Sequence, residues 1–283
     1  MPSFSLAALT ALELPPSQLV EVASACGFEQ VGFRLLAATP GGTSYPLMDD
    51  SKGLKETKAR LTATSVKVAD LEVVAFRPET VVRSLEAFLE AGLELGARHT
   101  LVAAYDRDLE RFSDRFAEYC EMAGRLGLTA DLEFMPWTYV PDIKAAARIV
   151  EKVSSPAAGI LVDALHFDRS AGSFEDLRKI PVQRLHYWQL CDGPAERPTT
   201  TEDLIHAARE ERMFPGEGGL DLVRLTKEMP ADITISIEVP TAELAKTADA
   251  VTRARRALRG AKAVVAAASA ATEPDVHCPR TER

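Results

Sequence analysis

Apolar runs and amphipathic runs alternate along the chain from residue 4 to residue 268. Eight extended runs are rich in Val, Ile, Leu and aromatic residues and hold few alternating polar positions, which is typical of strands covered on both faces. These predicted strands are Phe4 to Thr10, Gln30 to Leu35, Val66 to Phe76, His99 to Tyr105, Ala130 to Met135, Gly159 to Leu165, Leu185 to Cys191 and Ile233 to Val239.

Helical patterns lie between these runs. Pro15-Pro16-Ser17 opens one that ends at Gly27, and apolar residues recur every three or four positions in Glu79 to Leu95. The second strand is followed by a weaker candidate helix, Gly53 to Thr62. Further helices are predicted at Leu109 to Leu126, Asp142 to Val153, Phe174 to Ile180, Thr201 to Glu211 and Ala242 to Ala268.

Eight strands that alternate with helices over roughly 250 residues predict an α/β fold, a (β/α)8 TIM-type barrel in a single domain at residues 1–271. The alternative, a doubly wound open sheet, is disfavoured because no GxGxxG follows the first strand. Residues 272–283 lose periodicity, so we expect a flexible C-terminal tail. The segment Ala37 to Asp50 follows the second strand, and we expect it to cover the active face as a lid.

Composition narrows the possible partners. The 283 residues are 46% hydrophobic and 27% charged, which indicates a globular chain with a core. Their 33 Lys and Arg and 42 Asp and Glu give a net charge of −9, which disfavours nucleic acid and anionic membranes as partners. A run of arginines, Arg253, Arg255, Arg256 and Arg259, is interpreted as the solvated face of the C-terminal helix.

The cysteines and the hydropathy profile predict a cytoplasmic protein. Cys26, Cys120, Cys191 and Cys278 form no CxxC pair, which indicates reduced thiols. The longest apolar stretch, residues 263–271, is shorter than the roughly 20 residues that span a bilayer. We therefore expect no membrane anchor and no export signal.

Four successive predicted strands carry one oxygen-bearing side chain near the C-terminal end: Glu133, Asp163, Gln189 and Glu238. They are 30, 26 and 49 residues apart, and the longest gap contains an insertion at residues 193–220. A barrel brings such positions together at its mouth, where three carboxylates repel one another unless a cation neutralises them. These residues therefore predict a divalent metal site. The oxygen-only ligand set favours Mn²⁺ or Mg²⁺ over Zn²⁺, with Co²⁺ as a further possibility.

Charged residues elsewhere are candidates to bind substrate. Arg34 ends the second strand and Glu72 lies within the third, so each is a candidate for the barrel mouth and equally for a structural ion pair. Arg34 would offer a fork to a carboxylate or enediolate oxygen. On the insertion, Arg197 and Arg212 are candidates to meet a phosphate or carboxylate.

The residues beside Gln189 are expected to have a structural role. His186 and Trp188 lie three and one positions before it, so strand alternation points them away from the lumen if Gln189 points inward. We therefore interpret both as packing between barrel and helices.

Five short runs, LEFMPW, GILVDALHF, LHYWQLCD, PGEGGLD and ISIEV, carry a family resemblance. In order and spacing they resemble the sugar phosphate isomerase/epimerase-like branch of the xylose isomerase-like barrels, and the likeness covers roughly residues 4 to 265. Ketose 3-epimerases, inosose dehydratases and 3-dehydroshikimate dehydratases belong to that group. The resemblance implies a small sugar or polyhydroxy acid as substrate and a homodimer or homotetramer as the assembly.

The resemblance also implies roles for individual residues. Glu133, Asp163, Gln189 and Glu238 would hold the metal, and His166 would contact substrate oxygens. Sugar epimerases of this group usually carry His where this chain has Gln189, and Gln is similar to the dehydroshikimate dehydratase-like members.

Removing a proton next to a carbonyl needs a base and a cation that holds the negative oxygen. By the resemblance, Glu133 and Glu238 serve as both ligands and acid/base groups, with His166 as the third catalytic residue. Reprotonation of the metal-stabilised enolate gives an isomerase or epimerase of a ketose or related polyhydroxy ketone. Loss of a β-hydroxyl instead gives a dehydratase, the alternative favoured by Gln189. A non-catalytic sugar-binding protein is a third possibility, and a phosphodiesterase would need more histidine ligands and a basic groove.

Overall fold

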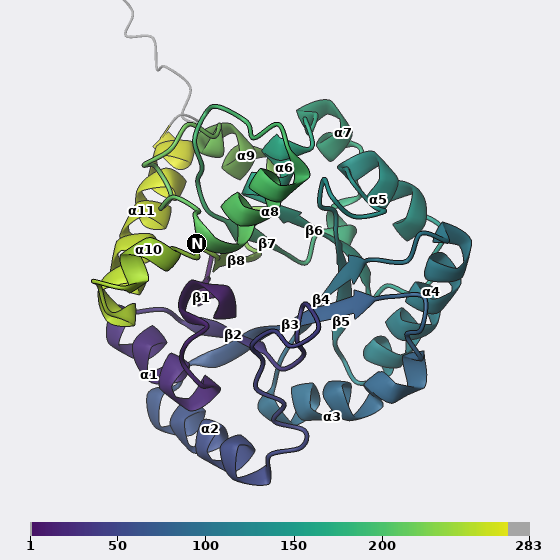
Figure 1. Ribbon diagram of the computed structural model, residues 1–283, viewed down its shortest axis with the longest axis horizontal. Helices are drawn as coiled ribbons and strands as arrows, with labels where there is room; N and C mark the ends of the chain where they lie inside the picture. Colours follow the sequence, from purple (N-terminus) through teal and green to yellow (C-terminus); the bar gives the residue numbers. More distant parts are fainter. Residues whose placement is uncertain (1, 271–283) are drawn as a thin grey trace, which may run out of the picture.

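The computed structural model describes residues 2–270, and the expected tail at 272–283 lies outside the described residues. Eight parallel strands close into a barrel in chain order, with β8 paired to β1, which confirms the predicted fold class (Figure 1). The strands are β1 (Phe4–Leu6), β2 (Gln30–Arg34), β3 (Lys67–Phe76), β4 (His99–Ala104), β5 (Thr129–Glu133), β6 (Ala158–Asp163), β7 (Tyr187–Leu190) and β8 (Thr234–Ile237).

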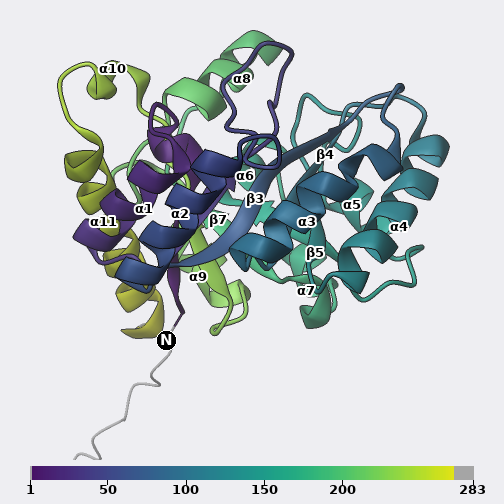
Figure 2. The same cartoon turned by 90° about the horizontal axis from the view of Figure 1, so that it is seen from below.

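Helices surround the barrel, and the long loop after β2 lies on the same side of it as α8 (Figure 2). The α-helices are α1 (Pro16–Cys26), α2 (Ser51–Thr64), α3 (Glu86–Leu95), α4 (Leu109–Arg125), α5 (Ile143–Val150), α6 (Ala164–Arg169), α7 (Phe174–Arg178), α8 (Thr201–Glu210), α9 (Leu222–Glu228), α10 (Ala242–Ala245) and α11 (Ala250–Ala270). Short 3-10 helices occur at Ala8–Ala11, Val82–Leu85 and Val182–Arg184.

The first strand is shorter than its apolar run predicts. It ends at Leu6, and Ala8–Ala11 turn into a 3-10 helix. The hydroxyl of Thr10 donates to the carbonyl of Ile237 at 2.9 Å and accepts from the amide of Val239 at 2.9 Å. These side-chain hydrogen bonds hold Thr10 against the end of β8 in place of further strand pairing.

Two hydrophobic layers divide the strand residues. The larger one packs between strands and helices and includes Trp188, which confirms the outward direction expected for that residue. A smaller cluster fills part of the barrel lumen: Val73, Leu101, Ala103, Met135, Leu161 and Tyr187. His186 was expected to pack against helices, and this is wrong. Its Nδ1 lies 2.6 Å from Asp131 Oδ1, because His186 precedes β7 and can turn beneath the lumen.

One residue of the C-terminal arginine run also departs from expectation. Arg253 is only 3% exposed, and its Nη1 donates to the carbonyl of Thr10 at 2.7 Å. It also pairs with Glu13, so this position anchors α11 to the segment after β1. Arg256 keeps the expected solvent-facing position, in an ion pair with Glu217. Within residues 2–270, α11 and the other helices are all too short or too polar to cross a membrane.

Candidate active site

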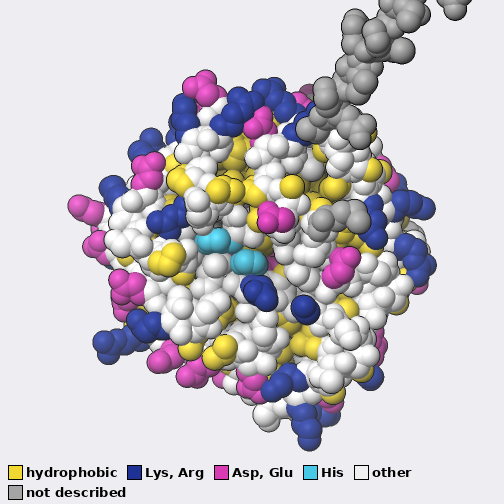
Figure 3. Space-filling model, turned by 180° about the vertical axis from the view of Figure 1, so that it is seen from behind, with side chains coloured by type: hydrophobic (Ala, Val, Ile, Leu, Met, Phe, Trp, Pro, Cys, Tyr) yellow, Lys and Arg dark blue, Asp and Glu magenta, His cyan; other side chains and the backbone are white. Residues whose placement is uncertain are grey.

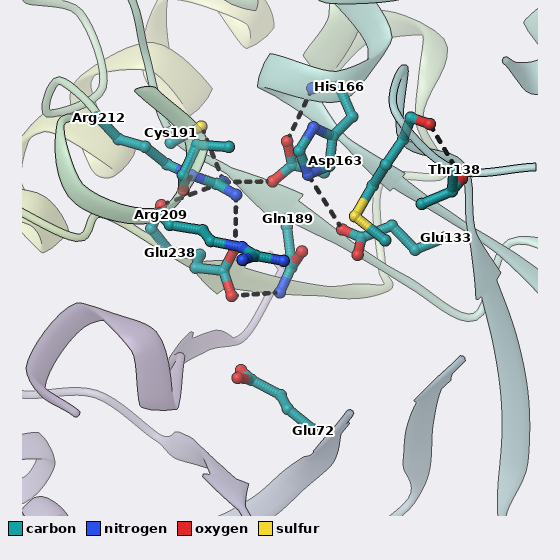
Figure 4. Close-up of polar contacts among 12 residues, drawn as sticks. Glu72, Glu133, Thr138, Asp163, His166, Gln189, Cys191, Arg209, Arg212 and Glu238 are labelled. Atoms are coloured by element: carbon teal, nitrogen blue, oxygen red, sulfur yellow. Dashed lines mark hydrogen bonds and ion pairs between the residues drawn. The ribbon is translucent and has the colours of Figure 1, made fainter. Parts of the chain in front are cut away.

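Four side chains from neighbouring strands meet at the C-terminal end of the barrel (Figure 4). Glu133 and Asp163 are the last residues of β5 and β6, Gln189 lies within β7, and Glu238 directly follows β8. All four are at most 5% exposed. Gln189 pairs in register with Asp163, and its Nε2 donates to Glu238 Oε1 at 3.1 Å. The structure therefore brings together the four residues that the sequence singled out.

Arg212 lies among these carboxylates. Its Nη1 is 2.6 Å from Asp163 Oδ2 and its Nη2 is 2.8 Å from Glu238 Oε2. Its Nε donates to the carbonyl of Ala208 at 2.8 Å, which fixes the guanidinium from the end of α8. Arg212 was a candidate to meet a substrate anion, whereas in the structure it binds the protein's own carboxylates.

Burial and neighbouring charges shift the pKa values of the three acids in different directions. Burial raises the pKa of Glu133 well above its usual value, and the charges of Asp163 and Glu238 add to this. Burial likewise raises the pKa of Glu238 to about 7, although Arg212 opposes the shift. Burial also works against ionised Asp163, but Arg212 and His166 hold the pKa of that carboxyl below its usual value. Asp163 is therefore the most acidic of the three, and Glu133 and Glu238 give up their protons at higher pH than a free glutamate does.

His166 belongs to the same site through the turn that joins β6 to α6. Its backbone amide donates to Asp163 Oδ1 at 2.9 Å, so Asp163 caps the helix that carries His166. The imidazole packs edge-on against Trp137, and its Nε2 lies 3.8 Å from Glu133 Oε1. Burial lowers the pKa of His166 to about 4, so the ring is neutral at pH 7.

Arg34 and Glu72 form a buried ion pair at the same end of the barrel. Arg34 Nη2 lies 2.6 Å from Glu72 Oε2, and the side chains are 11% and 0% exposed. Arg34 was expected either at the barrel mouth or in a structural ion pair, and it has both positions: it pairs with Glu72, and it lines the cavity at the barrel mouth. The structure does not bring Arg197 here. Its guanidinium binds Asp168 at 2.9 and 3.0 Å, on the outer side of α6.

A cavity of about 240 Å³ opens above these residues. Part of its wall comes from the loop after β2, through Ala38, Thr39, Gly42 and Thr43. The backbone amide of Tyr45 donates to the carbonyl of Arg34 at 2.9 Å, which ties this loop to the strand end. The loop therefore lies where a lid was expected, and its opening stays a prediction.

Arg209 also belongs to the site and was not predicted from the sequence. It extends from α8 over the carboxylate cluster, toward Gln189 (Figure 4). Its Nη2 lies 3.4 Å from the hydroxyl of Tyr105, and among residues 2–270 no carboxylate lies within salt-bridge distance of its guanidinium. Arg209 lies in the last turn of α8, and Arg212 follows two residues after the helix ends, so the sequence places Arg209 only three positions before the arginine that was already a candidate.

The donor set fits a divalent cation in chemistry and in charge. Gln189 Oε1 is a buried acceptor without a partner among the described residues. When all four are ionised, the carboxylates of Glu72, Glu133, Asp163 and Glu238 carry two more charges than Arg34 and Arg212, which is the charge of one such ion. Within residues 2–270, however, no group of three or more His, Cys, Asp or Glu side chains is arranged as a metal cluster. Asp163 and Glu238 are instead arranged around Arg212.

Known proteins resemble the chain in sequence and in fold. Residues 20–263 match the family model described as xylose isomerase-like TIM barrel. A 3-dehydroshikimate dehydratase of Pseudomonas putida is 28% identical over 103 residues, which are 36% of this chain and 16% of that protein. An inosose isomerase of Bacillus licheniformis is 28% identical over 129 residues, 43% of this chain and 44% of that protein. The crystal structure of an IolI protein with a bound zinc atom superposes with a TM-score of 0.79 at 20% identity, over 93% of this chain and 98% of that one.

Proposed function

Because the chain belongs to the xylose isomerase-like TIM barrel family, we propose that it is a divalent-metal-dependent enzyme that moves a proton next to a carbonyl in a small polyhydroxy compound. The convergence of Glu133, Asp163, Gln189 and Glu238 at the barrel mouth carries this proposal. Three buried carboxylates in one place store repulsion that a cation relieves. The cavity above them, of about 240 Å³, suits a small substrate.

The same four residues would hold the ion through oxygen atoms. Oxygen donors favour Mn²⁺ or Mg²⁺. When bound, the ion supplies polarisation of a substrate carbonyl and stabilises the negative oxygen that forms there. Gln189 contributes its unpartnered Oε1, and Asp163 contributes the carboxylate that is ionised at neutral pH.

Glu133 and Glu238 then act as the acid/base pair. They project from β5 and from the end of β8, so they approach the cavity from different sides (Figure 4). A carboxyl group whose pKa is raised toward neutral, as burial does for Glu238, both accepts and returns a proton near pH 7. One glutamate removes the proton from the carbon beside the carbonyl, and the other delivers a proton to the product.

The first candidate reaction is isomerisation or epimerisation of a ketose or related polyhydroxy ketone, in which the proton returns to carbon. The chain resembles an inosose isomerase over part of its length, which supports this reaction. Neutral His166, whose Nδ1 has no partner within residues 2–270, is then a hydrogen-bond partner for substrate hydroxyls.

A second candidate, dehydration of a carboxylate-bearing substrate, is favoured by Arg209. Its guanidinium faces the cavity with Tyr105 as its polar neighbour. With a divalent ion bound, the four carboxylates and two arginines are balanced, and Arg209 adds one positive charge that suits a carboxylate. In this reaction the second glutamate delivers its proton to the departing hydroxyl, and neutral His166 forms a hydrogen bond to that group. Resemblance to a 3-dehydroshikimate dehydratase over part of the chain also supports it.

One experiment tests the proposal and separates the two reactions. The purified protein, loaded with Mn²⁺, is incubated in D₂O with inososes, with ketoses and with 3-dehydroshikimate, and products are followed by NMR and mass spectrometry. Isomerisation incorporates deuterium into a product isomeric with the substrate, whereas dehydration gives a product lighter by one water. EDTA and Glu238→Gln should abolish either reaction, and Glu217→Gln, an exposed partner of Arg256, serves as the control. Substrate binding that survives both EDTA and Glu238→Gln, without turnover, would instead indicate a non-catalytic sugar-binding protein.

A further inference from the structure

The lumen of the barrel has an apolar half and a polar half below the candidate site. The apolar half is the lumen cluster of Val73, Leu101, Ala103, Met135, Leu161 and Tyr187, carried by β3 to β7. On β8, β1, β2 and β3 the corresponding inward positions are small or polar: Ser236, Ser5, Gly32 and Asp70. The direction of these side chains follows from their neighbours, since Phe4, Leu6, Ile235 and Ile237 belong to the outer layer.

Buried polar atoms without partners among the described residues lie in the polar half and on the neighbouring Tyr187 of the apolar cluster. Ser5 Oγ, Ser236 Oγ, Tyr187 Oη and both carboxyl oxygens of Asp70 have no hydrogen-bond partner among the described residues. Each of these four residues is 0% exposed. Buried polar atoms are nearly always hydrogen-bonded to protein or to ordered water, so this concentration in one place calls for a ligand.

Small side chains leave room in this half. Ser5 and Ser236 are register partners on adjacent strands, and barrel interiors are normally filled by bulky branched side chains. A Cβ on Gly32 would lie 2.8 Å from Asp70 Oδ2, so the carboxyl group of Asp70 leans across the bare backbone of β2. The carboxyl group of Asp70 therefore lies against β2, the strand that pairs with β1, which carries Ser5.

The polar half continues upward into the candidate site. Asp70 precedes Glu72 by two residues on β3, and Ser236 is the register partner of Gln189. Glu72 Oε1 and Gln189 Oε1 are themselves buried acceptors without partners among the described residues. One ligand group would thus satisfy unpartnered atoms at both levels.

The floor below is also polar. The ring of His99 stacks on Tyr187 with centroids 4.7 Å apart and lies parallel to His186 at 6.3 Å. The side chains of His99 and His186 are 12% and 16% exposed, and Figure 3 shows histidine side chains in the middle of the face opposite to that of Figure 1. On β8, β1 and β2 the hydrogen-bonded side chains of Thr234, Ser3 and Gln30 lie two residues before Ser236, Ser5 and Gly32 and extend this polar floor.

We propose that the polar half of the lumen binds a cluster of ordered water molecules anchored by Asp70, Ser5, Ser236 and Tyr187, which connects Asp70 to Glu72 and Gln189. Water suits these groups better than a monovalent cation, because the serine and tyrosine hydroxyls are donors as well as acceptors and a cation satisfies acceptors only. Burial, together with the charges of Glu72 and Glu238, raises the pKa of Asp70 well above its usual value, so Asp70 is a donor too. This inference does not depend on the proposed reaction.

A high-resolution crystal structure of the full chain tests the occupant directly. We expect ordered water within hydrogen-bond distance of Asp70, Ser5, Ser236 and Tyr187. A second crystal grown with Rb⁺ distinguishes a cation, which would give an anomalous peak at this position. That peak, or a dry lumen in which Asp70 has turned to a protein partner, would overturn the proposal.

The Tm of Asp70→Leu gives a second test, because a lumen with water and a lumen without water predict changes of opposite sign. If ordered water forms hydrogen bonds to Asp70, then Asp70→Asn keeps these bonds, whereas Asp70→Leu leaves the water cluster without this partner. Asp70→Leu should therefore lower Tm by about 2–4 °C or more. If the lumen is dry, Asp70 is an unsatisfied buried group, and Asp70→Leu should raise Tm instead. Ser236→Ala should also lower Tm, whereas Ser269→Ala, on the exposed face of α11, is the matched control. Equal effects of the two serine variants would contradict a cluster.

Discussion

The guanidinium of Arg212 lies 2.6 Å from the carboxylate of Asp163, and the two side chains are 2% and 0% exposed. This pair joins the loop after α8 to the end of β6 across the mouth of the barrel. Charges in such a place are costly to separate, because each would remain buried without its partner. Arg212 therefore holds the candidate site together in the metal-free protein.

Replacing Arg212 by Met should destabilise the metal-free protein by about 3–5 kcal/mol, the usual cost of leaving a buried charge unpaired. Urea unfolding in EDTA measures this difference. Arg256→Met breaks the exposed pair with Glu217 and is the control, with an expected loss of about 1 kcal/mol or less. Similar losses for the two variants would show that Arg212 is not a structural centre.

A bound divalent metal ion should reduce the difference in stability between Arg212→Met and the wild type. Because Arg212→Met leaves Asp163 and Glu238 without a cation, Mn²⁺ should raise the Tm of this variant more than that of the wild type. A protein gains about 2.7 kcal/mol when the free Mn²⁺ concentration is a hundred times its own Kd, so at one shared Mn²⁺ concentration the variant that binds more tightly gains more. Glu133→Gln should weaken the effect in both. A Tm that does not respond to Mn²⁺, Mg²⁺ or Zn²⁺ in any of these proteins would remove the metal site from the proposed function.

The pH dependence of stability should reveal Glu238. Burial raises its folded-state pKa to about 7 from the ordinary value of 4.5, so the folded protein binds a proton that the unfolded chain releases. This stabilisation is complete below pH 4.5 and is lost as the pH rises through 7. In EDTA, the free energy of unfolding of the wild type should fall relative to that of Glu238→Gln by about 3 kcal/mol between pH 4.5 and 8.

The comparison with Glu238→Gln removes the contributions of titrating groups whose pKa does not depend on Glu238. His166, whose pKa burial lowers to about 4, acts in the opposite direction because the unfolded chain binds its proton more readily. Its effect is present in both proteins and cancels in the difference. A difference that does not change with pH would mean that Glu238 is ionised throughout.

Arg209 should make the site bind ligands with a carboxylate group more tightly than neutral ligands. In the Mn²⁺-loaded protein we expect shikimate, a hydroxylated cyclohexene carboxylate, to bind more tightly than neutral myo-inositol by calorimetry. Arg209→Gln should weaken the binding of shikimate by about 10- to 100-fold and leave myo-inositol unchanged, because only the former uses the guanidinium. Arg255→Gln, an exposed change on α11, is the control. Equal losses for both ligands would assign Arg209 a structural role.

The strand positions of the site were predictable because a parallel barrel has a fixed period. Glu133, Asp163, Gln189 and Glu238 stand at strand ends in the sequence, and closure of the sheet brings strand ends together without any detail of packing. The same argument does not reach Arg209 and Arg212. They lie on the insertion after β7, where the chain has no period that links it to the strands.

The two predictions that were wrong, for Arg253 and for His186, failed for the same reason. Arg253 has the spacing of a solvated helix face, but the turn of the chain at Thr10 brings a backbone carbonyl to it. His186 obeys strand alternation only while it belongs to a strand, and it lies just before the first residue of β7. In both cases a contact more than 50 residues away in sequence determines the direction of the side chain, which local pattern does not encode.

Gly159 should be intolerant of even one added methyl group. A Cβ at this position of β6 would overlap Asp131 Oδ1 and His186 Nδ1 and would lie 2.8 Å from His186 Cε1, because these side chains meet over its bare backbone. Gly159→Ala should therefore destabilise the protein by about 1–3 kcal/mol in urea unfolding. Gly124→Ala, whose Cβ would come no closer than 3.2 Å to Ala157, is the control and should have a smaller effect.

A double variant shows whether the pair between His186 and Asp131 is the reason. If Gly159→Ala acts by displacing His186, then its cost should shrink in a His186→Ala background, by about 0.5–3 kcal/mol of coupling. The single variant His186→Ala leaves Asp131 buried without its 2.6 Å partner, so it is destabilising by itself. If the losses of unfolding free energy in the two single variants simply add up in the double variant, then Gly159→Ala acts through contacts elsewhere in β6 and not through His186.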